Sequence, residues 1–255
     1  MAGESHRRGH DHHPIRPRCK AVSPLNDLGQ PVGDSLDWSP VQAPGRTTII
    51  GRTCRLEALD ASQHAADLHS ANLLDETGEM WTYMPYGPFG SLGDYSSWCD
   101  SMAASEDPLF YAVVDQASGG AIGVASYLRI EPAVGVIEVG HIAYSPPLQR
   151  TTAATEGMYL MMRRVFDELG YRRYEWKCDA LNAASRRAAD RFGFSFEGVF
   201  RQATMYKGRN RDTAWYSITD VEWPALKARF EAWLDESNFS ADGAQHLSLN
   251  EVATS

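Results

Sequence analysis

Cysteine, positive charge and long apolar runs are scarce in this sequence of 255 residues. The four cysteines (Cys19, Cys54, Cys99 and Cys178) are far apart, and none forms a Cys-x-x-Cys pair. This spacing excludes a dense disulfide framework and a zinc-finger ligand set, and it favours free thiols in a reducing compartment. No apolar run approaches the roughly 18 residues of a membrane-spanning helix. The N-terminal MAGESHRRGHDHH lacks the apolar segment of a secretory signal. A cytoplasmic protein that spans no membrane is therefore expected.

The balance of charge limits the partners. Acidic residues outnumber basic ones by 33 to 24, which gives a net charge of −9. Nucleic acids and anionic membranes attract proteins with a positive field, so neither is expected as a partner. An amine-bearing substrate is compatible with this charge. The 43% of hydrophobic residues is sufficient for the core of a globular domain.

Composition divides the chain into three parts. Residues 1–45 are rich in proline, glycine, histidine and charge, and we expect an extended N-terminal arm. Residues 46–236 carry the regular hydrophobic patterns of one folded domain, and residues 237–255 are expected to form a flexible tail. His10, His12 and His13 could hold a metal ion weakly. A solvated terminus is the preferred interpretation, because a mobile segment gives metal ligands no fixed support.

Hydrophobic periodicity predicts a mixed α/β fold. Strands are expected over residues 47–59, 109–115, 121–131, 136–145, 172–179, 194–201 and 212–219. Helices are expected over residues 61–74, from about Gly93, and over residues 158–169, 182–192 and 223–236. Short links join the three strands between residues 109 and 145, which is typical of an antiparallel meander.

The stretch SPPLQRTTAATEGMYL (residues 145–160) suggests a binding site. A strand ends there in a Pro-Pro turn, and small residues from Thr151 to Thr155 begin a helix. The first N–H groups of a helix have no intrahelical partner, and the helix dipole favours negative charge beside them. Small side chains would let a pyrophosphate approach these groups. The alternative is an ordinary capped helix that packs on a sheet.

Three ordered blocks carry a family resemblance. They are VIEVGHIAYSPPLQRTTAATEGMYLMM, CDALNAASRRAADRFGFSFEG and YKGRNRDTAWYSI. Over residues 47–223 the chain resembles the GNAT superfamily of N-acetyltransferases, and within it the RimJ/RimL type that acetylates ribosomal proteins. The resemblance implies a splayed, mostly antiparallel sheet of about seven strands flanked by helices. It also implies that acetyl-CoA binds in the opening beside the fourth strand, with no metal.

The resemblance assigns cofactor-binding residues. In the family signature Gln/Arg-x-x-Gly-x-Gly/Ala, Gln149 is the first position, Thr152 replaces the usual glycine, and Ala154 is the last. The expected pyrophosphate cradle is thus Gln149, Arg150, Thr151, Thr152, Ala153, Ala154 and Thr155, with threonine hydroxyls as additional donors. Asn182 occupies the position that contacts the pantetheine arm, although it could simply cap its helix. Backbone N–H groups of Ile142, Ala143 and Tyr144 would polarise the thioester carbonyl.

Catalytic residues are only partly implied. Ser185 matches the position proposed to protonate the departing CoA thiolate, and Ala189 stands where many GNAT members use tyrosine. The glutamate expected nineteen residues after this serine is Thr204, so that general base cannot be carried over. Glu138 is the better candidate, and burial in its apolar strand would raise its pKa. Asp212 is a further candidate that more readily forms an ion pair with a nearby arginine.

The acceptor side depends on aromatic residues. Trp81, Tyr83 and Tyr86 of WTYMPYGPF lie where the family forms its acceptor wall, and they could enclose an amine. A small hydrophobic cluster under a loop is the alternative. His141 is a further substrate-binding candidate. Strict alternation places it on the face opposite Glu138 unless a bulge intervenes.

These observations predict an acetyl-CoA-dependent N-acetyltransferase. Its acceptor would be a primary amine, on a protein N-terminus or a small molecule, attacking directly in a ternary complex. A CoA-binding module without turnover is the alternative, motivated by Thr152 and by the missing family glutamate. A non-enzymatic protein that binds partners through its arm and tail is a third hypothesis. A homodimer is expected only by analogy with the family.

Overall fold

The computed structural model of the protein describes residues 23–252. The chain divides into two units, Met1–Ser39 and Pro40–Ser255. In the first unit, the Asn26 side chain accepts hydrogen bonds from the N–H groups of Leu28 and Gln30, and these bonds form a local turn. The second unit begins at Pro40 and not at the expected residue 46. The suggested ligands His10, His12 and His13, and Cys19, lie outside the described residues.

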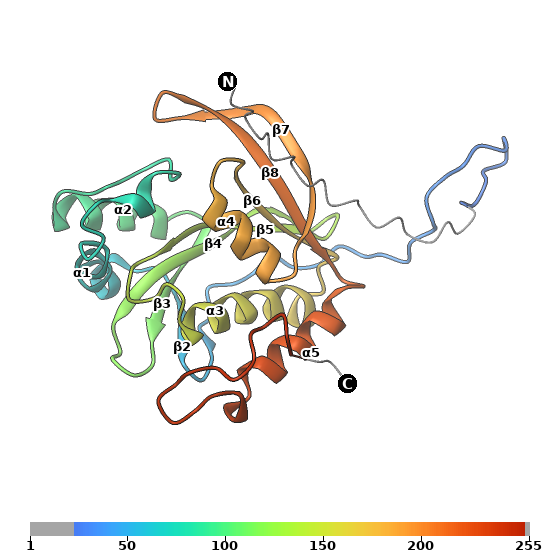
Figure 1. The fold of residues 1–255 in the computed structure, drawn as a ribbon. Coiled ribbons are helices and arrows are strands. Elements are labelled where there is room, and N and C mark those ends of the chain that lie inside the picture. The colour runs from blue at the N-terminus through green and yellow to red at the C-terminus, as the bar shows by residue number, and fades with distance from the viewer. Residues whose placement is uncertain (1–22, 253–255) are drawn as a thin grey trace, which may run out of the picture. The chain divides into compact units, whose positions relative to one another are not determined.

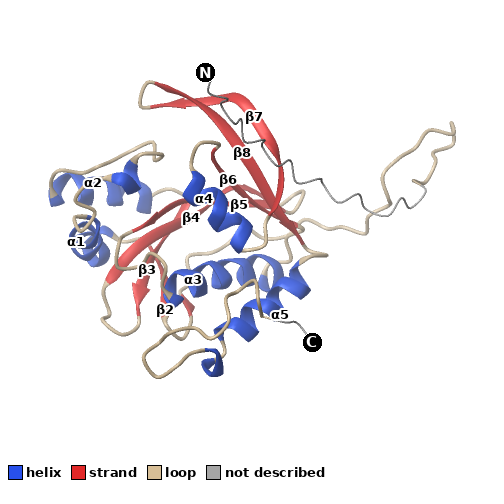
Figure 2. Ribbon diagram, viewed as in Figure 1, coloured by secondary structure: helices blue, strands red, loops and turns tan. Residues whose placement is uncertain are grey.

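One sheet of eight strands organises the second unit (Figures 1 and 2). The strands are β1 (Ile49–Ile50), β2 (Cys54–Ala58), β3 (Leu109–Asp115), β4 (Ala121–Glu131), β5 (Val136–Tyr144), β6 (Arg173–Asp179), β7 (Ser195–Tyr206) and β8 (Arg209–Thr219). Their order is β1-β2-β3-β4-β5-β6-β8-β7. All neighbours are antiparallel except β5 and β6, which are parallel. The predicted mixed α/β fold is confirmed.

Helices cover both faces of this sheet. They are α1 (Ala61–Asn72), α2 (Leu92–Ala103), α3 (Thr152–Arg163), α4 (Ala183–Arg191) and α5 (Trp223–Leu234). Buried residues of α1 and α2 form a small cluster with Phe110, Ala112 and Val124. Buried residues of α3, α4 and α5 belong to a larger cluster with the alternate strand residues, among them Tyr111 and Tyr127. The sheet therefore has one face under α1 and α2 and another under α3, α4 and α5.

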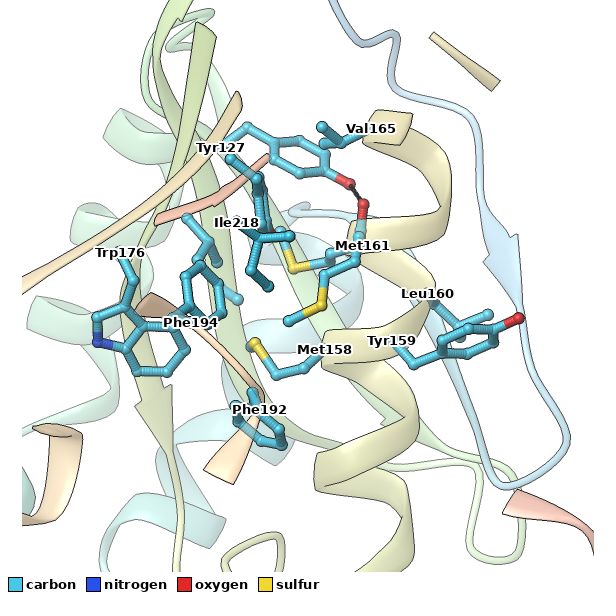
Figure 3. Close-up of a cluster of buried hydrophobic side chains, with 14 of the residues drawn as sticks. Tyr127, Met158, Tyr159, Leu160, Met161, Val165, Trp176, Phe192, Phe194 and Ile218 are labelled. Carbon is cyan, nitrogen blue, oxygen red and sulfur yellow. Dashed lines mark hydrogen bonds between the residues drawn. The ribbon is translucent and has the colours of Figure 1, made fainter. Parts of the chain in front are cut away.

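Helix α3 is the centre of the larger cluster (Figure 3). The apolar residues that predicted an amphipathic helix, including Met158, Met161 and Val165, are fully buried. Tyr127 of β4 donates a hydrogen bond to the Met161 carbonyl (2.9 Å). All residues from 153 to 162 are buried, so the helix is not one-faced as the pattern predicted. Helix α5 and strand β2 also contact α3 and cover the side that the pattern left to solvent.

A buried carboxylate explains why the first predicted strand is two strands. Glu156 of α3 accepts hydrogen bonds from the N–H groups of Arg52 (2.7 Å), Thr53 (2.6 Å) and Cys54 (3.1 Å). These bonds turn the chain between β1 and β2. Gly51 is required there, because a Cβ atom at this position would lie 2.7 Å from the Glu156 carboxyl carbon. The sequence pattern did not identify this contact between positions about a hundred residues apart.

The C-terminal region is more ordered than predicted. After α5, a short 3₁₀ helix (Glu236–Asn238) leads into residues 239–252, which were expected to be a loose tail. Leu249 is fully buried in the larger cluster. The Asn238 side chain donates to the carbonyls of Trp233 (3.0 Å) and Leu247 (3.1 Å) and ties the segment to α5. Within the described part of the chain, no helix has the length and apolar character needed to cross a bilayer.

Candidate active site

The site is built around the point where β5 and β6 separate. Their parallel pairing joins residues 136–139 to residues 173–176 and ends there. Beyond it, β5 continues beside β4 as far as Tyr144, and β6 continues beside β8 as far as Asp179. In the described chain no strand pairs with the β6-facing edge of residues 140–144. Backbone groups on that edge are therefore available to a ligand.

A tight loop follows β5 and leads into α3. The Ser145 carbonyl accepts a hydrogen bond from the Gln149 N–H (3.1 Å). The Gln149 side chain reaches back to donate to the Tyr144 carbonyl (2.8 Å). Arg150 takes a left-handed conformation with a φ of 62°. Thr151 then caps the helix. The loop thus turns the chain sharply and points the start of α3 back toward the end of β5.

The start of α3 leaves backbone donors without partners. The Thr151 hydroxyl oxygen accepts a hydrogen bond from the Ala154 N–H (3.1 Å) and satisfies one of the first N–H groups. Thr152 and Ala153 are the first two helical residues, and their N–H groups have no intrahelical acceptor. The positive end of the helix dipole lies at the same place. This arrangement can bind a phosphate group.

The threonine hydroxyls have different roles from those expected. Thr151 is occupied as the cap and also donates to the Leu148 carbonyl (2.7 Å). Thr155 is buried and accepts a hydrogen bond from Arg191 of α4 (3.1 Å). Of the three threonines, Thr152 alone opens on a groove of about 360 Å³. The groove is lined by Arg52, Thr53, Thr152, Glu236, Phe239, Ser240, Ala241 and Gly243.

Helix α4 brings Asn182 and Ser185 beside the separated strands. Asn182 caps this helix, and its side chain accepts a hydrogen bond from the Ser185 N–H (3.0 Å). The Ser185 hydroxyl oxygen accepts a hydrogen bond from the indole N–H of Trp176, on β6 (3.0 Å). The same hydroxyl also interacts with the Cys178 thiol of β6. Ala189, at the position where many GNAT members carry tyrosine, is fully buried.

Glu138 lies in a buried cluster of charges on the other face. Its Oε2 atom is 2.8 Å from the Lys177 ammonium and 3.5 Å from the Arg129 guanidinium. Lys177 also contacts Glu175 (2.6 Å). Burial raises the pKa of Glu138, and the charge of Lys177 opposes this shift. The Oε1 atom lies 3.7 Å from where a Cβ atom on Gly140 would stand.

A β-bulge places His141 on the same face as Glu138. The register between β4 and β5 shifts at this point, and His141 has a φ of 50°. Its ring packs against Phe110 and stacks on Tyr86. The Tyr86 hydroxyl lies 3.1 Å from His141 Nδ1. Burial, with a contribution from Arg211, lowers the pKa of His141 to about 4. The imidazole is therefore neutral at pH 7.

The aromatic residues before α2 divide between a buried hydrophobic cluster and positions beside the opening. The Trp81 indole is 4% exposed and packs with Phe89 in the smaller cluster, so its ring is part of the core and not of an open wall. Tyr86 faces His141. The Tyr83 hydroxyl donates to the Leu181 carbonyl, beyond the end of β6 (3.2 Å). Tyr83 and Tyr86 therefore border the site, and Trp81 supports them from below.

Sequence reasoning missed residues on the hairpin of β7 and β8. These strands are longer than predicted and turn at Lys207, whose ammonium donates to the Trp81 carbonyl (2.7 Å). Arg211 is also on this hairpin, and its charge acts on His141. The basic run YKGRNR was the available signal. Asp212 accepts hydrogen bonds from Gln202 (2.7 Å) and Asn210 (3.0 Å), and the expected arginine ion pair does not form.

Comparison with known families agrees with this geometry. The profile described as "Acetyltransferase (GNAT) domain" matches residues 54–195, more than half of the chain. The chain belongs to the GNAT family of acetyltransferases. GNAT enzymes transfer an acetyl group from acetyl-CoA, so the opening between β5 and β6 is the candidate site for this cofactor. Among residues 23–252, no three His, Cys, Asp or Glu side chains are positioned to hold a metal ion.

Solved structures of GNAT acetyltransferases are similar to this chain in sequence and fold. A GCN5-related N-acetyltransferase from Brucella melitensis shares 47% identity over 84% of this chain and 97% of its own, with a TM-score of 0.83. A probable GNAT acetyltransferase from Chromobacterium violaceum shares 39% identity over 82% and 99%, with a TM-score of 0.69. The ribosomal L7/L12 α-N-protein acetyltransferase RimL shares 22% identity over 68% and 94%, with a TM-score of 0.59, which shows a common fold alone. No curated protein matches the chain.

Proposed function

We propose that the protein is an acetyl-CoA-dependent N-acetyltransferase of the RimJ/RimL type that acetylates a primary amine by direct attack in a ternary complex. The observation that carries this proposal is the separation of β5 from β6 after Val139 and Trp176. Free N–H groups at the start of α3 lie on one side of the opening, and titratable side chains lie on the other. A thioester and an amine could thus meet from opposite faces of one sheet.

The cofactor would bind to residues 149–155 and to α4. The N–H groups of Thr152 and Ala153 would bind the pyrophosphate, with the Thr152 hydroxyl as an additional donor. Asn182 would contact the pantetheine arm through the amide atoms that its capping bond leaves free. The groove beside Thr152 is a suitable place for the nucleotide end. These assignments use backbone donors, so replacement of the usual glycine by Thr152 is compatible with binding.

The transfer would need few side chains. The amine nitrogen attacks the thioester carbonyl, and N–H groups between Ile142 and Tyr144 stabilise the oxyanion. The C–N bond forms, the C–S bond breaks, and the amine loses a proton. Glu138 would receive this proton at Oε1, through a bridging water molecule. Ser185 would donate its hydroxyl proton to the CoA thiolate, since its oxygen already accepts a hydrogen bond from Trp176.

The acceptor would occupy the space bordered by Tyr83, Tyr86 and His141. Neutral His141 would donate its Nδ1–H to the Tyr86 hydroxyl oxygen, which leaves Nε2 to accept a hydrogen bond from an amine. Trp81 would support this space, because its carbonyl accepts a hydrogen bond from Lys207 and its ring packs against Tyr86. The sequence-based candidates Trp81, Tyr83, Tyr86 and His141 thus stay together in this proposal with distinct roles.

A CoA-binding protein without turnover is the second candidate function. The observation that favours it is the ion pairing of Glu138 Oε2 with Lys177 and Arg129 (2.8 and 3.5 Å), which engages this carboxylate and opposes the rise of its pKa caused by burial. Such a protein would bind acetyl-CoA and acetylate none of a broad panel of amines.

Calorimetry with acetyl-CoA, followed by an amine screen, tests the proposal. We expect micromolar binding at one site per chain, and release of CoA with at least one class among peptides, amino acids and polyamines. Binding without CoA release from any acceptor would favour the second candidate. Absence of acetyl-CoA binding would contradict both functions.

A further inference from the structure

Arg211 brings a positive charge to the opening between β5 and β6. It lies near the start of β8, opposite Thr204 of β7. On β8, Thr213 pairs with Asp179 at the end of β6, so Arg211 lies two residues beyond the end of a strand that borders the opening. Its charge also contributes to the lowered pKa of His141 on β5. No residue of the proposed transfer step uses this charge.

In the described chain, Arg211 lacks the carboxylate partners that Arg129 and Arg173 of the same sheet have. Its Nε atom is buried without a hydrogen-bond partner, and no carboxylate of residues 23–252 forms an ion pair with it. By contrast, Arg173 contacts Glu175 (2.7 Å) and Glu197 (2.5 Å). A buried donor without an acceptor costs about 1–3 kcal/mol. An anionic ligand at this place would remove that cost.

The nearest strand partners do not supply the missing acceptor. Asp179 pairs in register with Thr213, two residues from Arg211. Its two oxygens are bonded to the Leu181 N–H (2.8 Å) and the Tyr206 hydroxyl (2.8 Å). Glu138, the carboxylate on the opposite side, is paired with Lys177 (2.8 Å). The acidic groups near Arg211 are thus held by other residues.

Strand alternation places Arg211 on the acceptor face. On β8, Ala214 and Tyr216 belong to the cluster under α3, α4 and α5. Arg211 and Trp215 have the opposite parity and lie on the face of Lys177, whose ammonium is 3.8 Å from the Trp215 ring centre. The cofactor is proposed to approach from the α3 side. An anion bound to Arg211 would therefore belong to the acceptor.

We propose that Arg211 binds the carboxylate of an acceptor that carries its amine and its carboxylate on one small molecule, as an amino acid does. This inference rests on the proposed N-acetyltransferase function and names its substrate class. Guanidinium and carboxylate form charge-assisted, often bidentate hydrogen bonds. The same positive charge disfavours the ammonium form of a nearby amine and so favours the neutral nucleophile.

Contacts around the site favour a small acceptor over a peptide. Lys207, at the tip of the hairpin that carries Arg211, donates to the Trp81 carbonyl (2.7 Å). The Tyr83 hydroxyl donates to the Leu181 carbonyl (3.2 Å). These bonds join the aromatic segment to the hairpin and to the chain after the end of β6. The acceptor side is thus bridged by the protein's own chain, which leaves less room for a bound polypeptide.

The test compares amino acids with their amides in Arg211→Met and in a matched control. Arg209→Met removes the same charge from an exposed position on the same strand. CoA release is measured with the twenty amino acids, with their α-carboxamides, and with C-terminally amidated peptides that begin with Asp or Glu. Calorimetry with acetyl-CoA is done on every variant.

We expect the wild type to prefer the best amino acid over its amide by about 10²-fold in kcat/KM, the value of a good charged hydrogen-bonded pair. In Arg211→Met, kcat/KM for the amino acid should fall by about the same factor, and kcat/KM for the amide should change little. The affinity for acetyl-CoA should remain within twofold of wild type. Arg209→Met should behave as wild type. An acid-to-amide ratio near one, or a ratio unchanged in Arg211→Met, overturns the proposal. So does a preference for the amidated acidic peptides over every free amino acid.

A binding measurement keeps the inference testable without turnover. Saturation-transfer NMR with N-acetylamino acids and their amides, with and without CoA, reports on the acceptor site directly. We expect the acids to bind wild type and Arg209→Met, and to lose binding by about tenfold or more in Arg211→Met. Equal binding of acids and amides, or no binding of either, overturns the inference. If the wild type does not bind acetyl-CoA, the proposed function itself is contradicted. Failure of the inference about Arg211 can therefore be distinguished from failure of the proposed function.

Discussion

The cofactor side and the acceptor side of the separated strands use different chemistry. On the cofactor side, α3 presents backbone N–H groups of Thr152 and Ala153 and the end of a helix dipole. On the acceptor side, charged and titratable side chains converge from four strands, with Glu138 and Arg211 among them. Backbone donors tolerate changes of side chain, whereas a cluster of side chains depends on each member. We therefore expect binding of acetyl-CoA to tolerate neutral substitutions, and choice of acceptor to be sensitive to single substitutions of any kind.

The largest effect is expected from a negative charge on the cofactor side. Thr152→Glu would place a carboxylate where the pyrophosphate is proposed to bind, and affinity for acetyl-CoA should fall by about 10³-fold from charge repulsion. Stability should not fall, because a carboxylate near a helix N-terminus is favourable. Calorimetry and urea unfolding check both expectations. Thr152→Gly, the usual family residue, is the control and should bind as well as wild type. Unchanged affinity in Thr152→Glu would move the phosphate site elsewhere.

On the acceptor side, Glu138→Gln should lower kcat by about 10²-fold if this carboxylate receives the amine proton. The rise of kcat with pH that follows ionisation of Glu138 should also disappear. Affinity for acetyl-CoA should remain within twofold, because the carboxylate lies on the other face. Lys177 keeps Glu175 as a partner, so the protein should still fold. A mutant with wild-type kcat at every pH would exclude Glu138 from the transfer.

His141 should make stability fall in acid. Its pKa is about 4 in the folded protein, below the ordinary value of 6.5, so the unfolded chain binds more protons between these pH values. Stability is fully present above the unfolded pKa and is lost as pH falls toward the folded pKa, by up to about 3 kcal/mol. Urea unfolding at pH 7.5 and pH 4.5 measures it. In His141→Gln, the free energy of unfolding should decrease much less between these two pH values than in the wild type. Equal decreases in the two proteins would show that the imidazole is not shielded from solvent.

A smaller effect on kcat is expected for Ser185, which lies on α4 beside the opening between the two sides. Ser185→Ala should lower kcat by about 30-fold, because a CoA thiolate is a good leaving group and needs only modest acid assistance. Affinity for acetyl-CoA should be unchanged. Stability should decrease by about 1 kcal/mol, since the Trp176 indole loses its acceptor. Pre-steady-state CoA release separates the chemical step from binding. Full activity would reduce Ser185 to a residue of the first helical turn.

The smallest effect is expected at the edge of the acceptor side. Lys207→Met removes the hydrogen bond from the hairpin tip to the Trp81 carbonyl. The KM for the acceptor should rise by about fivefold, which corresponds to the loss of about 1 kcal/mol for a hydrogen bond made by an exposed side chain. The kcat and the affinity for acetyl-CoA should not change. A steady-state analysis with both substrates varied measures the three constants. A change in the affinity for acetyl-CoA would show that the two sides are coupled through the hairpin.

The helix starts on the proposed cofactor side could be predicted because they are local in sequence. Thr151, Asn182 and Ser185 take their positions from turns and helix starts within a few residues of each other. The roles of the threonine hydroxyls were not predicted, because Thr155 is engaged by Arg191 from another helix. The tip of the β7–β8 hairpin was missed because its residues are mostly exposed and give no alternating apolar pattern. The packing of Leu249 was missed because this leucine stands alone in a polar segment and is buried only by tertiary contacts.

The sequence by itself determined the mixed α/β fold, the family, and the backbone donors at the start of α3, because hydrophobic periodicity and helix capping act over short distances along the chain. Only the tertiary structure decided the acceptor side. The bulge at His141, the pairing of Glu138 with Lys177 and the isolation of Arg211 each depend on strands brought together from distant parts of the chain. Electrostatic partners are set by distance in space, which local sequence patterns do not encode.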